Sequence, residues 1–174
     1  MKPALPLTGQ ERFFDADQVI VSKTNPAGTI TYANRAFLEV SEFTEAEVIG
    51  KPHNIIRHPD MPRCLFRKLW RRIKAGKEMF AYVVNRTHHG NHYWVLAHVT
   101  PSFDAEQRII GFHSNRRVPE RAPLERVIIP LYRALREREQ AEGDPEAAVA
   151  AGEAHLRAHL EQLGVGYDRF IFSL

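Results

Sequence analysis

The sequence predicts an α+β fold: a five-stranded antiparallel sheet with short helices gathered on one face and further helices at the C-terminal end. Two short strand patterns come first, followed by short helical segments and one longer amphipathic helix. Three strand patterns come next, and their polar, hairpin-length connections make sequence neighbours pair as antiparallel strands. The remaining residues are helical in pattern.

The first two strands are expected at residues 19–21 and 29–32. The segment Asn-Pro-Ala-Gly at 25–28 lies between them, and its turn residues favour a hairpin. Asn34 can accept a hydrogen bond from the following turn of backbone, so it is placed to cap a short helix over residues 35–40.

The central helices follow. Thr44 and Glu47 have the spacing of a capping box and start a second short helix that ends at Gly50. Residues 53–62 contain two prolines and are expected to be irregular, and a longer helix is predicted over residues 63–75. Its apolar residues have helical spacing and form one inward stripe: Leu65, Phe66, Leu69, Trp70 and Ile73.

The last three strands are predicted at residues 79–86, 92–100 and 109–116. Successive side chains of a strand point to opposite faces of the sheet, which divides the middle strand into two sets. One face carries Trp94, Leu96, His98 and Thr100, and the other carries Tyr93, Val95, Ala97 and Val99.

The rest of the chain is predicted to be helical. An apolar stripe runs from Leu124 to Leu135, and Pro130 is expected to kink that helix. An N-cap, a proline and an acid at residues 144–146 start a second helix. The tail at residues 167–174 is too apolar to remain in water, so we expect it to pack on the domain, on a second copy or on a partner.

Composition excludes several protein classes. The 174 residues are 44% hydrophobic and 26% charged, which is typical of one globular domain with a core and argues against disorder. The single cysteine, Cys64, cannot form an internal disulfide. No apolar run approaches the ~20 residues that a bilayer span needs, and residues 1–10 do not resemble a secretion signal. We therefore expect a cytoplasmic protein.

Charge is distributed unevenly. Residues 141–174 carry six acids and two arginines, whereas residues 1–140 carry a balance of +7. The basic excess is concentrated at residues 57–77, which can attract phosphate or form a solvated helix face. Its members include Arg63, Arg67, Lys68, Arg71, Arg72 and Lys74.

A distinctive run of eleven residues reads Pro52-His53-Asn54-Ile55-Ile56-Arg57-His58-Pro59-Asp60-Met61-Pro62. Further residues accompany it along the chain: Asn85-Arg86, Gly90, His92-Tyr93-Trp94-Val95, Pro101 and Gly111. Together with the order of elements, this pattern resembles the PAS sensory domain of bacterial aerotaxis receptors. The resemblance runs from about residue 18 to residues 130–135.

The resemblance implies a PAS fold with non-covalently bound FAD between the sheet and the short helices. In that family the Arg-His-Pro-Asp segment supports flavin binding, which corresponds to Arg57, His58 and Asp60, and His53 in the same run joins the expected contacts. It also implies a sensor that reads oxygen or electron-transport state through flavin reduction and passes the signal to attached or partner domains.

The chemistry of other residues suits such a site. Amide side chains such as Asn34 and Asn85 donate and accept hydrogen bonds, so they can follow the change that reduction makes at a flavin ring. Arg57 offers forked donors to a pyrophosphate or to Asp60. An aromatic wall can come from Phe66, Trp70 and Trp94.

These assignments have structural alternatives. Arg57 and Asp60 can form an ion pair that only fixes a proline-rich loop. Asn34 can act solely as a helix cap, and His58 as a structural hydrogen-bonding residue. The two aromatic residues on the apolar stripe are core residues first.

Two positions depart from the family pattern near the expected pocket. Met79 stands where the family commonly has tryptophan, and His98 stands where asparagine is expected. Both are therefore candidate pocket residues that alter flavin affinity or redox potential. A histidine there also leaves haem open as an alternative cofactor, because histidine ligates iron.

We predict an FAD-binding PAS redox or oxygen sensor at residues 18–118, with an N-terminal lead-in at 1–17 and a helical extension with an apolar tail at 119–174. The lead-in and the extension are expected to transmit the signal to a protein partner or a dimer mate. The alternatives are a haem- or metabolite-binding PAS module and a ligand-free PAS interaction domain. The sequence has no nucleophile–base pair, metal cluster or glycine-rich dinucleotide loop, so neither enzymatic activity nor a metal site is predicted, and nucleic acid is not an expected partner.

Overall fold

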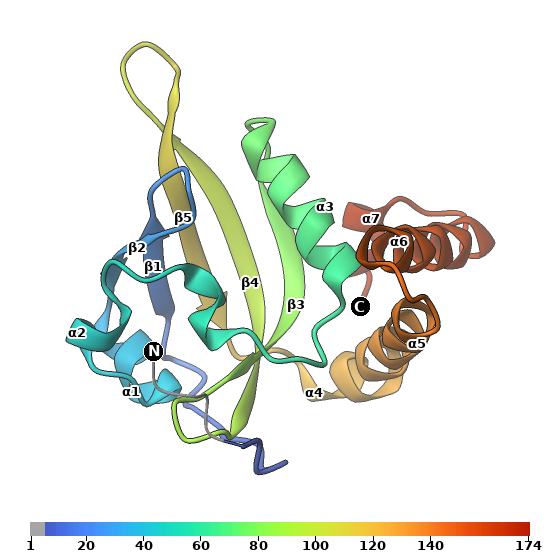
Figure 1. The fold of residues 1–174 in the computed structure, drawn as a ribbon, viewed down its shortest axis with the longest axis horizontal. Helices are drawn as coiled ribbons and strands as arrows, with labels where there is room; N and C mark the ends of the chain where they lie inside the picture. Colours follow the sequence, from blue (N-terminus) through green and yellow to red (C-terminus); the bar gives the residue numbers. More distant parts are fainter. Residues whose placement is uncertain (1–5) are drawn as a thin grey trace.

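The computed structural model describes residues 6–174 and confirms the predicted five-stranded antiparallel sheet with helices on one face (Figure 1). The first half of the chain contains β1 (Ile20–Thr24), β2 (Ile30–Ala33), α1 (Arg35–Ser41), α2 (Glu45–Val48), the short 3-10 helix η1 (His53–Ile56) and α3 (Arg63–Lys74). The second half contains β3 (Met79–Arg86), β4 (His92–Phe103), β5 (Ile109–Arg117), α4 (Arg121–Pro123), the π-helical turn η2 (Leu124–Ile128), α5 (Ile129–Gln140), α6 (Pro145–Gln162) and α7 (Tyr167–Phe172).

The strands are arranged in the order β2-β1-β5-β4-β3, and every neighbouring pair is antiparallel. Hairpins join β3 to β4 and β4 to β5, whereas β1 pairs with the last strand, β5. The edge strands are therefore β2 and β3. The register places Ala97 opposite Arg116, and Arg116 opposite Ile20, so side chains from three strands share one row of the sheet.

The two faces of the sheet differ in what covers them. Helices α1, α2, η1 and α3 lie over one face, which we call the inner face (Figure 1). It is formed by Ile20, Ser22, Thr24, Met79, Ala81, Val83, Asn85, Tyr93, Val95, Ala97, Val99, Phe112, Ser114 and Arg116. The opposite outer face contains Trp94, Leu96 and His98, which are only partly buried.

The lead-in lies against the β3–β4 hairpin. Gly90 in that turn has a φ of 91°, and a Cβ atom there would lie 2.1 Å from the carbonyl oxygen of Pro6, so only glycine fits. The backbone N–H of Thr8 donates to Gly90 at 3.0 Å, and that of Arg12 donates to His92 at 2.7 Å. These backbone hydrogen bonds hold the lead-in alongside the end of the β3–β4 hairpin.

Residues 119–174, which we call the extension, pack on the domain itself. Helices α5 and α6 lie side by side next to α3, and α7 returns to β3 (Figure 1). The apolar tail thus takes the first of its three expected positions: Phe170 and Ile171 are buried against the domain. The π-helical turn η2 precedes α5, and Pro130 lies in the first turn of α5, so the kink expected at this residue stays a prediction.

Two tyrosines of the extension cover the edge strand β3. The hydroxyl of Tyr132 donates to the carbonyl of Tyr82 at 2.6 Å, and that of Tyr167 donates to the carbonyl of Phe80 at 3.1 Å. These two carbonyls are on the side of β3 where a further strand would pair. Between residues 6 and 174, no helix has both the length and the apolar character needed to cross a membrane.

Candidate functional site

The inner face contains a buried cation, Arg116, that is not matched by an acid. Arg116 is 4% exposed, and no carboxylate pairs with it anywhere in residues 6–174. Its Nη2 donates to Ser22 Oγ at 2.9 Å and to His53 Nε2 at 2.7 Å, and its guanidinium lies over the Phe37 ring at 5.7 Å. Burial lowers the pKa of Arg116 to about 10, so the group stays charged at neutral pH.

His53 is held in its neutral form by the same contact. A guanidinium can only donate, so His53 Nε2 must accept, and Ser22 Oγ lies 2.9 Å from the same nitrogen. The residue reaches the surface in part, but this nitrogen lies between the buried side chains of Ser22 and Arg116. Burial and the charge of Arg116 lower the pKa of His53 to about 3.

Several buried polar atoms on the inner face have no hydrogen-bond partner among the described residues. Buried polar groups in native proteins are nearly always paired, so a cluster of unpaired ones calls for an explanation. These atoms are Thr24 Oγ1, Asn85 Nδ2, Tyr93 Oη, Ser114 Oγ and Arg116 Nη1. Asn85 and Tyr93 face each other across β3 and β4, with side chains close enough to interact. Burial outweighs the opposing effects of Arg116 and Asn85 and raises the pKa of Tyr93, which therefore keeps its proton.

The Arg57–Pro62 segment borders this face. The backbone of Arg57 forms an isolated antiparallel bridge with Asn85, and its guanidinium lies over the Phe66 ring at 4.4 Å. Burial lowers the pKa of Arg57. His58 is 6% exposed, and its Nδ1 accepts from the backbone of Asp60 at 3.2 Å.

Asp60 itself points outward. Its side chain is 79% exposed and lies 3.7 Å from His58 Nδ1. Its carboxylate contacts this histidine, whereas Arg57 contacts Phe66, so the ion pair between Arg57 and Asp60 weighed from the sequence is not formed. Burial outweighs the charge of Asp60 and lowers the pKa of His58.

Other predicted residues also lie on or under the inner face. Met79 is buried opposite Val99, and Trp70 of α3 packs edge-on against Phe112 with ring centroids 5.5 Å apart. Phe66 is partly buried against the core. The structure therefore brings His53, Arg57, Phe66, Trp70, Met79 and Asn85 to the inner side of the sheet.

The side chain of Asn34 binds the backbone at three points. Its Oδ1 accepts from Phe37 N at 2.9 Å and from Val21 N at 2.9 Å, and its Nδ2 donates to the carbonyl of Val19 at 2.8 Å. The residue is the N-cap of α1 and also ties that helix to β1. Both polar atoms of its side chain therefore bind the backbone, which is the role that the structural alternative gives to Asn34.

Trp94 and His98 lie on the outer face, away from the other predicted residues. Trp94 packs beside Tyr132 of α5, and His98 stacks on Phe80 at 4.0 Å and lies 2.7 Å from Glu78 Oε2. Strand alternation is the reason: both share a face with Leu96, opposite to Tyr93. The structure thus separates them from the inner-face set and gives no support to haem ligation by His98.

The basic face of α3 meets the acidic extension. Arg67 pairs with Glu146, Arg71 with Glu153 at 3.3 Å, and Arg72 forms two bonds of 2.7 and 2.9 Å with Asp168. The uneven charge in the sequence therefore serves an intramolecular contact. Neither of the two interpretations taken from the sequence, phosphate attraction or a solvated face, included this contact.

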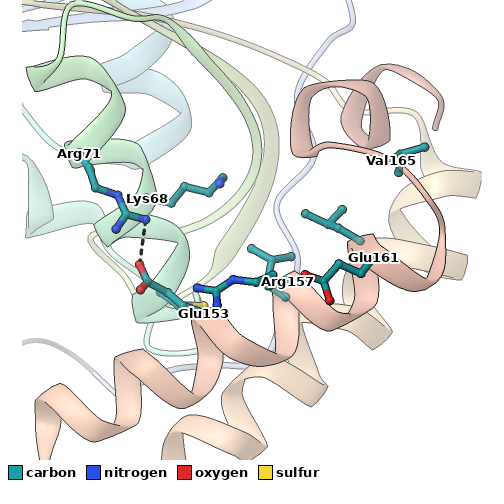
Figure 2. A pocket seen from close by; sticks show the side chains of 9 residues that line it. Lys68, Arg71, Glu153, Arg157, Glu161 and Val165 are labelled. Atoms are coloured by element: carbon teal, nitrogen blue, oxygen red, sulfur yellow. Dashed lines mark hydrogen bonds and ion pairs between the residues drawn. The ribbon is translucent and has the colours of Figure 1, made fainter.

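A hollow of about 280 Å³ lies between α3 and α6 (Figure 2). Figure 2 shows the Arg71–Glu153 ion pair at one side of it and Arg157 beside Glu153. Cys64 lines the hollow as a buried residue, and burial together with Glu139 raises the pKa of its thiol. This hollow is at the contact with the extension and does not border the inner face of the sheet.

The inner-face residues fit the expected flavin by their chemistry. A flavin ring presents both donors and acceptors along one edge, and the unpaired atoms include an amide nitrogen, three hydroxyls and a guanidinium nitrogen. Phosphate or ring oxygens can also compensate a buried cation that has no acid partner. No group of three or more metal-ligating residues occurs between residues 6 and 174.

Sequence reasoning missed Arg116, Ser22, Thr24, Tyr93 and Ser114. A weak signal was present in the last strand: Phe112, Ser114 and Arg116 alternate with His113, Asn115 and Arg117, so Arg116 is in phase with the aromatic Phe112. Which face of the strand was buried depended on its pairing with β1, and the sequence alone did not reveal that pairing.

A scan of protein-family models matches residues 11–115 with the family described as the PAS fold. The chain is also similar to the aerotaxis receptor of Escherichia coli strain K12, with 40% identity over 121 residues, which is 68% of this chain and 23% of the receptor. Phototropin-2 of Oryza sativa subsp. japonica is 29% identical over 94 residues, 54% of this chain and 10% of that protein. The chain thus spans less than a quarter of the length of these relatives.

Solved structures share the fold. The light-state structure of the blue-light photoreceptor Aureochrome1 LOV superposes with a TM-score of 0.56 at 17% identity, covering 63% of this chain and 87% of that one. The PAS domain of the fruit-fly ELK potassium channel gives a TM-score of 0.52 at 14% identity, covering 57% and 85%. The family match ends at residue 115, so helices α4 to α7 lie outside it.

Proposed function

The chain belongs to the PAS family, and from that premise we propose that it binds FAD on the inner face of its sheet and senses redox or oxygen state. PAS signalling sensors similar to it include the aerotaxis receptor. Flavin reduction supplies electrons and protons to a ring whose hydrogen-bonding edge then changes. Residues of this chain that follow the change would convert it into a change of conformation.

The observation that carries the proposal is Arg116. A buried charge without a counter-ion is costly, and here it lies in a row of unpaired polar atoms. A ligand with oxygen and nitrogen atoms on one edge would provide hydrogen-bond partners for the Arg116 guanidinium and for the unpaired polar atoms. The two titratable neighbours keep one protonation state around neutral pH, since His53 stays neutral and Tyr93 stays protonated.

We assign the Arg57–Pro62 segment to the border of this site. Arg57 carries its charge at the edge of α3, close to the backbone of Asn85, and can reach a phosphate group of the cofactor. His58 and Asp60 fix the conformation of the segment, because the backbone N–H of Asp60 donates to His58 Nδ1. The side chain of Asp60 is exposed. Trp70, Phe66 and Met79 would provide apolar contacts.

We further propose that the signal leaves through the lead-in and the extension, toward a protein partner or a second copy. Both segments contact the sheet or α3, and they contact each other through the Glu11–Arg121 ion pair of 2.6 Å. A change at the inner face can therefore reach either end of the described chain through packed elements.

The test is to measure the absorption spectrum of the purified protein and to titrate the apoprotein with FAD, FMN and haem. We expect flavin absorption bands and preferential binding of FAD. A colourless protein that binds no flavin would contradict the proposal and leave the ligand-free interaction domain. A strong haem band would instead point to the haem module.

Arg116→Met gives the first prediction. The variant removes the buried charge, so we expect FAD affinity to fall at least about tenfold while the apoprotein becomes no less stable. Fluorescence titration and urea unfolding measure the two quantities. The matched control is Arg117→Met, which changes the next, exposed residue on the same strand and should leave FAD affinity unchanged. Equal affinity of the Arg116 variant and the wild type would overturn the role of Arg116.

A further inference from the structure

Helix α3 begins without a cap of its own. Pro62 is at the N-cap position and makes no capping bond, and the first turn contains Arg63 and no acid. The N-terminus of a helix leaves backbone N–H groups unpaired and carries partial positive charge. A cation in the first turn adds to that charge, so this helix start needs an anion from elsewhere in the chain.

Glu139 of α5 provides the anion. Its Oε1 accepts from the backbone N–H of Cys64 at 2.8 Å, and its Oε2 accepts from that of Arg63 at 3.0 Å. Arg136 Nη1 donates to Oε2 at 3.0 Å, and the Glu139 side chain is 1% exposed. A residue 76 positions away in sequence thus caps α3 from within the extension.

The same helix start is where the Arg57–Pro62 segment ends. The backbone N–H of Met61 donates to the carbonyl of His58 at 3.1 Å, and Met61 is 2% exposed. Arg57, at the other end, bridges to Asn85 and lies over Phe66 of α3. Because both ends of this short segment are fixed, its conformation depends on the position of the first turn of α3.

Helix α6 closes over the carboxylate. A Cβ atom on Gly152 would lie 2.9 Å from Glu139 Oε1 and 3.0 Å from Cys64 Sγ, so α6 approaches both closely. The docked α6 thus helps to bury Glu139, which is 3% exposed as a whole residue. Water entering there would compete for the two backbone N–H groups.

We propose that Glu139 is a positioning residue that couples docking of the extension to the cofactor site by holding the Arg57–Pro62 segment in its binding conformation. This inference rests on the proposed function, since it takes that segment to border the FAD site. Coupling between two sites is reciprocal, so bound FAD should also hold the extension more firmly in place.

The test compares Glu139→Gln with Glu153→Gln. In the first variant the amide –NH2 faces a backbone N–H, so one capping bond is lost together with the charge. Glu153 is a matched control because it also joins the extension to α3, through Arg71, but does not touch the start of the helix. A general loosening of the extension would affect both variants alike.

Three measurements are made on each variant and on the wild type, with the whole chain described above. Amide hydrogen exchange without FAD should be at least about tenfold faster at Arg63, Cys64 and the Arg57–Pro62 segment in Glu139→Gln only. FAD affinity should fall at least about fivefold in the same variant. FAD should slow proteolysis of the α5–α6 loop in the wild type and in Glu153→Gln, but not in Glu139→Gln.

The outcomes are separable. Unchanged exchange in Glu139→Gln, or faster exchange with unchanged FAD affinity, overturns the inference while the proposed function stands. If the wild type binds no FAD, the proposed function fails, and with it the coupling to FAD, but exchange in the segment still decides whether Glu139 positions it. If Glu139→Gln does not fold, Gly152→Ala, which crowds the same carboxylate, is measured in its place with the same readouts.

Discussion

Arg116 and His53 illustrate how one contact fixes two protonation states. The guanidinium can only donate, so it selects the histidine nitrogen that accepts, and its charge opposes protonation of the ring. Neither residue has an acid partner within the described chain. Lowering the pH should therefore destabilise this contact, because protonation of His53 would place two positive charges side by side.

That sensitivity gives the second prediction. Because the pKa of His53 is about 3 in the folded state, against 6.5 for an unperturbed histidine, the unfolded chain binds a proton that the folded chain does not. The contribution to stability is present above pH 6.5 and is lost as pH falls toward 3. Between pH 7 and pH 5.5 we expect a loss of about 1 kcal/mol from this residue.

Urea unfolding at the two pH values measures the effect. In His53→Asn, the free energy of unfolding should fall by about 1 kcal/mol less between pH 7 and pH 5.5 than it does in the wild type. The contribution of buried His58, whose pKa is also lowered, remains. Parallel slopes in the variant and the wild type would show that His53 titrates normally in the folded protein.

Single residues were predictable where their role is local. Asn34 was identified as a possible cap because a cap acts within four residues, and the structure shows that cap. Arg116 was not identified, because its burial depends on strands nearly a hundred residues apart in sequence. Trp94 and His98 were assigned to the site although strand alternation had already separated their face from that of Tyr93.

At the scale of elements, α3 was the most predictable part of the chain. Its apolar stripe and its end at Gly76 gave its position, and the structure has the helix at Arg63–Lys74. What periodicity could not show was its surroundings. The basic side of α3 faces the extension, and the cap of α3 comes from α5. Both contacts are tertiary, so the periodicity of the α3 sequence cannot reveal them.

Close approach of α6 to α5 and α3 gives the third prediction. Gly152→Ala puts a methyl group against Glu139 Oε1 and the Cys64 side chain, all in a buried place. Overpacking of this kind costs about 1–3 kcal/mol, which exceeds the gain in helix propensity of about 1 kcal/mol. Thermal unfolding should therefore shift to lower temperature.

Gly143→Ala is the control for that experiment, since a Cβ atom at Gly143 meets nothing within 4 Å. It should change stability by less than about 0.5 kcal/mol. An equal or larger loss in Gly143→Ala would mean that the loop, and not the contact at Gly152, limits the packing of the extension.

At the scale of the whole molecule, the extension and the PAS core form one packed unit. Surface ion pairs such as Arg67–Glu146 contribute little by themselves. The buried contacts carry more: Leu156, Leu160 and Phe170 join the same apolar cluster as the sheet and α1. Docking of the extension should therefore depend only weakly on salt.

The two tyrosine contacts with β3 give the last prediction. Replacing Tyr132 and Tyr167 by Phe keeps the rings but leaves the carbonyls of Tyr82 and Phe80 without their donors. We expect a loss of about 1–2 kcal/mol for Tyr132→Phe, with a further loss in the double variant. Tyr32→Phe, at an exposed site, is the control and should be neutral in urea unfolding. If the double variant is as stable as the wild type, the packing of the two rings, and not their hydroxyl hydrogen bonds, protects the edge of β3.

The sealed edge of β3 also bears on how the protein behaves at high concentration. Its sequence Met-Phe-Ala-Tyr-Val-Val-Asn has no charge and no proline, and consists mostly of residues that favour extended backbone. A strand of this kind with free carbonyls is a template for intermolecular strand addition and fibril growth. Because the extension occupies those carbonyls, it protects the edge strand from intermolecular pairing. Displacement of the extension would expose an edge strand that is prone to aggregate.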